Sequence, residues 1–513
     1  MELFQIVENF QPLVDERLLR RAEELTPKLI YTEVAPVSVE VRSGDSKTAC
    51  ALSEMPAQGL GANDSIVFDF GNHFVGHVSF RFGFKGSHPD APAYFRLRFA
   101  EIPKEFTEDV SAYKGWISRG WIQEELVHID ELPAALALPR RYAFRYLELT
   151  VIDTSRKFRM TVEDIKLTAE TSVDLSSIDV QPTGDAMLDR IEAVSLRTLA
   201  NCMQTVFEDG PKRDRRLWMG DLRLQALANY VSFKNYDLVK RCLYLFGGSR
   251  FPDGRVSACL FTSPSVEADD TYFVDYSLLY PVVLEEYLAE TNDAEALSDL
   301  YDIAIQQIRI PWAQCENGLL PYSAAGSTFV DWCAGLDKHA AAQAILIYTA
   351  KYARRLAERK GDDSVIAEMD NIIEKATAAA RSFWDAEENC FVSGPERQRS
   401  LASQIWMVLA GVATQAEAQA LLADRSRYDA RYALETPYMN HYYVAALLES
   451  GLKEQAHAEM KAYWGSMIER NADTFWETWN PARPDASPYG GTIVNSYCHA
   501  WSCTPVWLLR NYF

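Results

Sequence analysis

The hydrophobic pattern of this 513-residue chain changes period once, close to residue 180. From about residue 29 to residue 171, short runs alternate apolar with polar residues, as at 65–71, 77–84, 93–99 and 144–151. This alternation, rich in aromatic and β-branched residues, indicates strands with one buried face. Because the strands follow one another without helical spacers, they predict an antiparallel β-sandwich. Before them, residues 15–24 are expected to form a helix.

From about residue 184 onward, the apolar residues recur with a helical period. A bundle, a solenoid or a closed double ring could pack these helices, but no repeat of fixed period supports a solenoid. About a dozen helices is the number needed for six hairpins closed into an (α/α)6 barrel. The predicted helices cover 187–204, 221–236, 272–291, 294–309, 338–359, 366–384, 401–411, 414–424, 438–450, 454–468 and 496–510.

A chain of this length is expected to form about two or three domains. We predict a multidomain β + α protein in which residues 1–180 form the β-sandwich domain, with a short N-terminal helical segment. Residues 181–513 would then form the (α/α)6 barrel.

The composition excludes several classes of partner. A net charge of -21 argues against binding to nucleic acid or to an anionic membrane surface. The chain has no run of about 18 apolar residues, and its first residues lack the regions of a signal peptide. Its nine cysteines contain no Cys-x-x-Cys pair, as in proteins that keep reduced thiols. We therefore expect a cytoplasmic protein with no nucleic-acid or membrane partner.

The turn over residues 209–221 combines three carboxylates with four cationic side chains. Gly210 and Pro211 interrupt regular structure at its start, and Trp218 and Gly220 precede a helical pattern. The carboxylates are Asp209, Asp214 and Asp221. One interpretation is a capping loop whose charges neutralise one another. The other is a set of carboxylates held on a rigid turn for catalysis, and spacing alone does not decide between the two.

A second candidate site lies at residues 475–479, where Glu477 stands between two tryptophans. Apolar walls raise the pKa of a carboxyl group, whereas cations lower it. The alternative is that both indoles are core and Glu477 caps the next element. Asp331 beside Trp332 is a smaller version of the same pattern, and Asp275 could be simply an N-cap.

The eight histidines predict no metal site, because His73 and His77 lie in a strand-rich segment where a spacing of four does not bring them together. His499 could bind a ligand or be a core histidine. The sequence also lacks the motifs of serine hydrolases, P-loop proteins and dehydrogenases. We expect neither metal nor cofactor. Two separated carboxylate sites among aromatic residues instead suggest glycoside hydrolysis, which needs a protonated acid and a second carboxylate.

The motif Asp209-x-Pro-x-Arg-Asp214-Arg-x-x-Trp218-x-Gly-Asp221 resembles the signature of the bacterial α-L-rhamnosidases of glycoside hydrolase family 78. The resemblance continues in residues 329–332, 476–479 and 496–499. With the β-sandwich and the barrel, it covers most of the chain. Family members are often longer and carry extra β-sandwich modules. The surface left without those modules would be covered in a homodimer.

The resemblance implies hydrolysis of terminal α-L-rhamnose from small glycosides or oligosaccharides. By position, Asp214 is similar to the general acid and Glu477 to the general base of an inverting mechanism. The carboxylates of inverting enzymes stand about 6.5–9.5 Å apart, which leaves room for the attacking water. Substrate-binding roles fall on Asp209, Arg213, Trp218, Asp221, Asp331, Trp332, Trp479 and His499.

The sequence departs from the family pattern at three positions. Gly210 replaces the commoner Cys, Lys212 replaces an uncharged residue, and Asp214 is one methylene shorter than the frequent Glu. Cations facing Asp214 would lower its pKa, and neighbouring carboxylates would raise it. Because a general acid must hold its proton near neutral pH, we predict that Arg213 or Arg215 faces a different partner. The alternatives are a barrel glycosidase acting on another sugar and a catalytically inactive rhamnose-binding protein.

Overall fold

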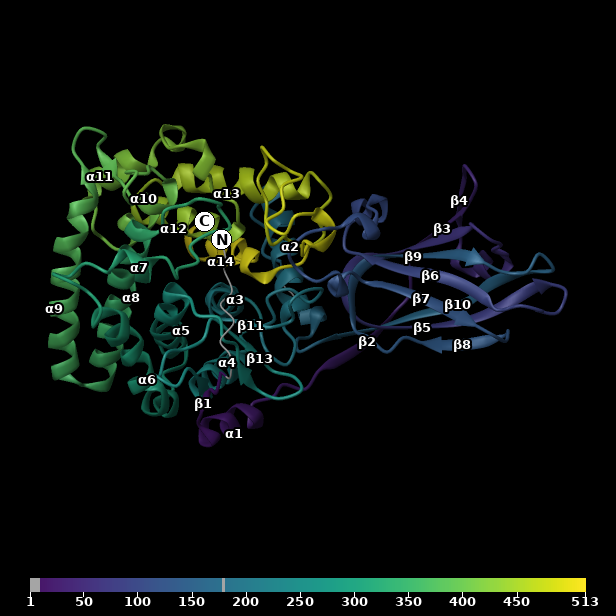
Figure 1. Ribbon diagram of the computed structural model, residues 1–513, viewed down its shortest axis with the longest axis horizontal. Coiled ribbons are helices and arrows are strands. Elements are labelled where there is room, and N and C mark those ends of the chain that lie inside the picture. The colour runs from purple at the N-terminus through teal and green to yellow at the C-terminus, as the bar shows by residue number, and fades with distance from the viewer. Residues whose placement is uncertain (1–9, 178–179) are drawn as a thin grey trace.

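The computed structural model describes residues 10–177 and 180–513. The long strands gather at one end of the molecule and most helices at the other, with short strands such as β11 (Leu217–Trp218) and β13 (Cys259–Phe261) among the helices (Figure 1). The predicted order, a β-sandwich followed by a helical domain, is confirmed. Because residues 178–179 lie outside the described residues, the boundary between residues 180 and 181 stays a prediction.

In the described residues, the strands of the β domain form one nine-stranded sheet, and the long strand β5 connects its two halves. It spans Ser65–Gly86 and pairs with β3 and β9 through its first half, and with β10 and β8 through its second half. The runs 65–71 and 77–84, predicted as separate strands, therefore belong to one strand. The described part of this sheet also contains β2 (Ile30–Val34), β3 (Ser38–Ser43), β4 (Ser46–Cys50), β6 (Ala93–Ala100), β7 (Glu124–Ile129), β8 (Ala134–Ala137), β9 (Tyr142–Asp153) and β10 (Phe158–Thr171).

Alternation along these strands builds the core of the sandwich. Phe68, Phe82, Phe95 and Phe144 point inward and are completely buried, while polar neighbours such as Arg81 and Arg145 are more exposed. This is the pattern of strands that bury one face.

An inner ring of helices forms the centre of the second domain. From α3 to α12 each inner helix contacts the next, and the 3-10 turn Ala500–Ser502, which precedes α14, closes the ring by contacting both α12 and α3. The inner helices are α3 (Met219–Val231), α5 (Val274–Thr291), α8 (His339–Lys360), α10 (Leu401–Leu409), α12 (Pro437–Glu449) and α14 (Pro505–Tyr512).

The outer helices alternate with the inner ones along the chain and surround them. They are α2 (Ala186–Cys202), α4 (Tyr236–Gly248), α6 (Ala294–Trp312), α9 (Asp363–Ala380), α11 (Gln415–Leu422) and α13 (Lys453–Ile468). Inner helix α3 is buried along almost its whole length, whereas outer helix α9 buries one stripe that includes Val365, Met369, Ile372 and Ala376. In the described part of the chain, the arrangement is that of six helical hairpins, with the short α7 (Tyr322–Ala325) between α6 and α8.

One helix was missed, and another was predicted to begin too early. Helix α4 was missed because its charged Lys240 and Arg241 are buried and so do not mark a solvent-facing side. The helix predicted over 496–510 begins only at Pro505, since residues 500–502 form a 3-10 turn.

Helix α1 spans Glu16–Glu24 and is capped by Asp15, in agreement with the predicted helix over 15–24. It packs on α4, with Leu18 and Ala22 in the core of the helical domain. Across residues 10–177 and 180–513, no helix is long and apolar enough to cross a membrane.

Candidate active site

A cavity of about 380 Å³ opens where the β domain meets the inner ring of helices. Its walls come from the turn before α3, the segments before α5 and α8, and the long loop before α14. Eight of the ten predicted site residues line it: Asp209, Arg213, Asp214, Trp218, Asp221, Trp332, Glu477 and His499. The structure thus brings together residues that lie up to 290 positions apart in the sequence.

Asp209 gives the 209–221 turn its shape. Its Oδ1 accepts a hydrogen bond from the Arg216 amide at 3.0 Å, and its Oδ2 accepts one from the Asp214 amide at 3.3 Å. Burial, together with the charge of Asp214, raises the pKa of Asp209 to about 7. The turn also explains Gly210, because a Cβ there would lie 2.5 Å from Ser496 Oγ and 2.6 Å from the Arg213 carbonyl oxygen.

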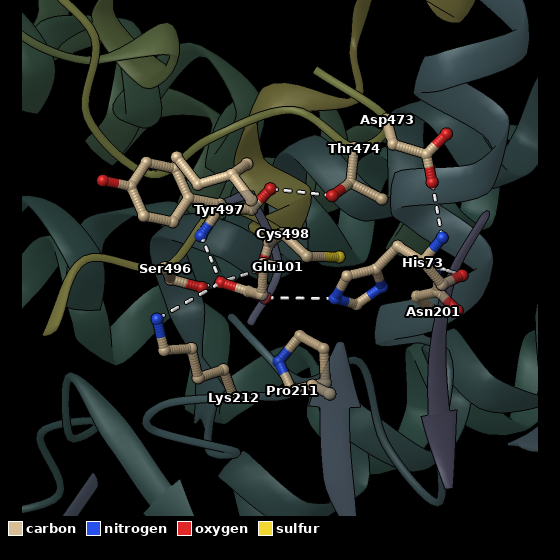
Figure 2. A network of polar contacts seen from close by, with 12 residues as sticks. His73, Glu101, Asn201, Pro211, Lys212, Asp473, Thr474, Ser496, Tyr497 and Cys498 are labelled. Carbon is tan, nitrogen blue, oxygen red and sulfur yellow. Dashed lines mark hydrogen bonds and ion pairs between the residues drawn. The ribbon is translucent and has the colours of Figure 1, made fainter. Parts of the chain in front are cut away.

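Lys212 fastens the turn to the β domain. Its buried ammonium contacts the Glu105 carboxylate, lies 3.7 Å from Glu101 Oε2 and donates to the Asn495 carbonyl at 2.9 Å. Figure 2 shows Glu101 between Lys212, His73 and the backbone of Tyr497. The Glu101 carboxylate accepts from the Tyr497 amide at 2.6 Å and lies 3.1 Å from His73 Nε2.

Glu477 is buried at the base of the cavity. Its Oε2 accepts from Arg213 Nη2 at 2.5 Å, and its Oε1 accepts from the Tyr489 hydroxyl. Burial opposes ionisation of this carboxyl group, but Arg213, His499 and Tyr489 outweigh burial and lower its pKa. Glu477 is therefore an anion at neutral pH, the form that can accept a proton from water.

Asp214 stands nearer the solvent than Glu477, with 20% of its side chain exposed against 4%. Arg213 Nη1 lies 3.4 Å from Asp214 Oδ1, so one guanidinium contacts both carboxylates. Arg215 turns away and donates to the carbonyl oxygens of Pro211 and Arg141, each at 2.8 Å. The prediction that one of the two arginines faces a different partner is confirmed.

His499 and Asp221 form an ion pair inside the cavity. Asp221 Oδ1 lies 2.9 Å from His499 Nε2, at ion-pair distance but without the alignment of a hydrogen bond. Burial disfavours the imidazolium, but the Asp221 carboxylate outweighs burial and raises the pKa of His499 to about 9. The imidazolium of His499 is therefore a buried cation beside the Asp221 carboxylate.

Aromatic rings form the remaining walls. Trp218 lies near Phe273, with ring centres 6.5 Å apart, and Phe329 lies 5.9 Å from Trp501. Trp218 and Trp332 each carry a buried indole N–H that no described residue of the chain accepts. Such a cavity offers flat apolar faces and free donors to a ligand such as a sugar.

Two predicted site residues lie outside the cavity. Asp331 accepts hydrogen bonds from the Glu435 and Trp332 amides and from the Thr436 hydroxyl, at 2.7–2.9 Å. It therefore anchors the start of α12. Trp479 is buried and donates its indole N–H to Ser466 Oγ at 2.8 Å. Neither side chain lines the cavity, and each is hydrogen-bonded within the protein.

Asp275 is not an N-cap: it lies in the first turn of α5, whose N-cap residue is Phe273, and its side chain supports the site from behind. It accepts from the Phe329 and Val330 amides at 2.9 and 3.0 Å. These contacts hold the segment that presents Trp332 to the cavity.

Sequence reasoning missed several lining residues, among them Tyr276, Tyr489 and Trp501 in the helical domain. It also missed Trp116 and Trp121, which come from the β domain. The two tryptophans stand in Gly115-Trp-Ile-Ser-Arg-Gly-Trp121, an aromatic pair in a loop between strands. This aromatic pair is the sequence feature that could have identified Trp116 and Trp121 as lining residues.

Both parts of the chain match models of known protein families. Residues 34–169 match the glycosyl hydrolase family 78 alpha-rhamnosidase N-terminal domain, and residues 180–512 match the bacterial alpha-L-rhamnosidase 6 hairpin glycosidase domain. A comparison with curated proteins gave no match.

Among solved structures, the chain is similar to a rhamnosidase from Klebsiella oxytoca with rhamnose bound. The TM-score is 0.93 at 43% identity, over 98% of this chain and 99% of that one. A family 78 rhamnosidase of Bacillus sp. GL1 gives a TM-score of 0.75 at 21% identity, over 91% of this chain and 49% of that one. A Streptomyces avermitilis α-L-rhamnosidase complexed with L-rhamnose gives 0.65 at 16% identity, over 95% and 44%.

The two weaker likenesses support the fold alone, whereas the Klebsiella protein is similar over the whole chain. Together with the match over residues 180–512, that similarity assigns the family. The chain belongs to glycoside hydrolase family 78, the α-L-rhamnosidases, and is a glycoside hydrolase.

Proposed function

We propose that this enzyme removes terminal α-L-rhamnose from small glycosides or oligosaccharides with inversion at the anomeric carbon. The observation that carries the proposal is the pairing of Asp214 and Glu477 through one guanidinium in an aromatic cavity. The similarity at 43% identity to a rhamnosidase with rhamnose bound supports the choice of sugar.

Asp214 acts as the general acid in this proposal. It is the more exposed of the two carboxylates, so it stands where the bond to the leaving group would emerge. Protonation of the glycosidic oxygen allows the leaving group to depart as a neutral alcohol. Asp209 and the turn backbone position this acid.

Glu477 acts as the general base. Its lowered pKa keeps it ionised, and each carboxylate oxygen retains a second lone pair after the contacts with Arg213 and Tyr489. A water held by Glu477 would attack the face of the sugar opposite to the leaving group. We propose that the two carboxyl groups stand about 6.5–9.5 Å apart in the complex with substrate.

The other lining residues would hold the sugar. Asp209, Asp221 and His499 offer charged partners for the hydroxyl groups, and Arg213 fixes the orientation of Glu477. Trp218 and Trp332 present ring faces and indole N–H donors. A 6-deoxy sugar suits such a cavity, because its methyl group and ring faces can contact indole without desolvating a polar group.

Two alanine variants test the assignment of roles. Asp214→Ala should slow the hydrolysis of rhamnosides with poor leaving groups far more than that of a dinitrophenyl rhamnoside, which needs little protonation. Glu477→Ala should slow both to a similar extent. Full activity in either variant would refute that role, and no turnover by the wild type would favour a catalytically inactive rhamnose-binding protein. A panel of aryl glycosides would reveal preference for another sugar.

We also propose that the enzyme works in the cytoplasm. All nine cysteines are free thiols, which fits a reducing compartment. A homodimer covering exposed apolar residues such as Tyr31 and Val37 is the assembly that we propose. Light scattering in solution would test it.

A further inference from the structure

One loop of the β domain reaches the mouth of the cavity. We call residues 108–123, which lie between β6 and β7, the rim loop. It contributes four lining residues, including Trp116 and Trp121. All twelve tryptophans lie in the described part of the chain, and Trp116 is the only one classed as exposed, at 50%. An exposed indole beside a cavity is unusual and points to contact with a ligand.

The rim loop is fixed against the helical domain. The Trp116 indole N–H donates to the Pro488 carbonyl at 2.7 Å, and the Tyr113 hydroxyl donates to the Tyr489 carbonyl at 2.8 Å. Gly115 allows the close approach, because a Cβ there would lie 1.9 Å from the Tyr489 carbonyl oxygen. The orientation of the Trp116 ring is therefore set before any ligand arrives, which reduces the entropy lost on binding.

Exposure rises from the base of the cavity to this ring. Glu477 is 3% exposed, the Asp214 side chain 20% and Trp116 50%. Under the proposed function, the terminal sugar fills the buried end, and its glycosidic oxygen faces Asp214. The leaving group must then extend toward solvent, past the residues of the mouth.

Aromatic side chains form a surface that extends toward the mouth of the cavity. The Trp116 ring centre lies 5.5 Å from that of Tyr489 and 6.5 Å from that of Trp332. Tyr489 in turn donates to Glu477, so the surface extends from the proposed base to the mouth. Indole faces of this kind stack on flat apolar rings, whether aromatic or sugar.

We propose that Trp116, together with Trp121 of the same loop, forms a binding subsite for the leaving group and favours rhamnosides whose leaving group carries a ring with a flat apolar face. This subsite rests on the proposed function, because only that function defines the leaving group. The β domain is then part of the substrate-binding site, and Trp116 is a specificity-determining residue.

The test compares Trp116→Ala, Trp116→Phe and the wild type on methyl, 4-nitrophenyl and rhamnosyl-glucoside substrates. Tyr322→Ala is the matched control, because Tyr322 is an aromatic residue 53% exposed that does not line the cavity. For Trp116→Ala we expect kcat/KM to fall about tenfold on ring-bearing substrates and less than about twofold on the methyl rhamnoside. Inhibition by free rhamnose should be unchanged, and Trp116→Phe should retain part of the selectivity.

A selective loss on the nitrophenyl or on the glucoside substrate supports the subsite and identifies the ring that it prefers. An equal loss on all three substrates, or weaker inhibition by rhamnose, would overturn the proposal, because Trp116 would then serve the terminal sugar. No change on any substrate would overturn it as well. A wild type that hydrolyses none of the rhamnosides would contradict the proposed function itself.

Discussion

Arg213 Nη2 lies 2.5 Å from Glu477 Oε2, although the two residues are separated by 264 positions in the sequence. Both side chains are almost completely buried, with 5% and 4% exposed. The guanidinium also donates to the Val494 carbonyl at 3.0 Å, so it joins the 209–221 turn to the loop before α14. Arg213 therefore fixes the position of Glu477 as well as its charge.

The Arg213–Glu477 contact predicts a change in pH dependence. Burial raises the pKa of Glu477 and Arg213 opposes burial, so Arg213→Gln should raise that pKa. Because the base must be ionised, the acidic limb of the kcat/KM profile should move to higher pH. Arg215→Gln is the control, since Arg215 bonds only to backbone carbonyls among the hydrogen bonds described. Identical acidic limbs for Arg213→Gln and the wild type would contradict the assignment.

The His499–Asp221 pair predicts a loss of stability at alkaline pH. The pKa of His499 is raised to about 9, against about 6.5 in an unfolded chain. The pair therefore stabilises the fold fully below about pH 6.5, and that stabilisation is lost as the pH rises through about 9. In Asp221→Asn the unfolding free energy should decline less over this interval. Denaturant titrations at several pH values measure it, and parallel declines would refute the prediction.

Replacing Lys212 should lower the stability of the fold strongly. Lys212→Met leaves the buried carboxylate of Glu105 without its cation and Glu101 with His73 alone, which should cost about 3–5 kcal/mol of unfolding free energy. Lys104→Ala breaks only the exposed pair with Asp485 and should cost about 0–1 kcal/mol. Thermal or denaturant unfolding checks both values. Equal stability of the two variants would show that Lys212 does not anchor the turn.

Replacing Asp331 should lower the stability of the fold but leave the binding site intact. Asp331→Ala removes the acceptor for three hydrogen bonds, two of them from residues 435 and 436 at the start of α12, which should cost about 2–4 kcal/mol. KM for an aryl rhamnoside should stay within about twofold of the wild type, because Asp331 does not line the cavity. A KM raised about tenfold or more in a folded protein would restore Asp331 as a substrate-binding residue.

The sequence predicted the order of the domains and most helices, because the hydrophobic period records which faces are buried. It failed at α4, where the charged Lys240 and Arg241 are buried, and at residues 496–504, which form loop and 3-10 structure. The long strand β5 was divided in two, since its register shifts between Asp69 and Phe74 interrupt the alternation.

At the site, local motifs identified the residues close to Asp214 and Glu477, because the charged turn and the Trp-Glu-Thr-Trp segment stand out within a few positions. Contacts between distant segments could not be predicted in this way. Lys212 looked like one of four similar cations until its partners in the β domain were seen. Likewise, Asp331 and Trp479 carry the right residue types, but their hydrogen bonds commit them to the protein interior.

The anomer first released from an aryl α-L-rhamnoside tests the central claim most directly. With Asp214 as acid and Glu477 as base, proton NMR should show β-L-rhamnose at the earliest times, followed by mutarotation to the equilibrium mixture. Early release of α-L-rhamnose would mean retention through a covalent intermediate, and would contradict the proposed role of Glu477.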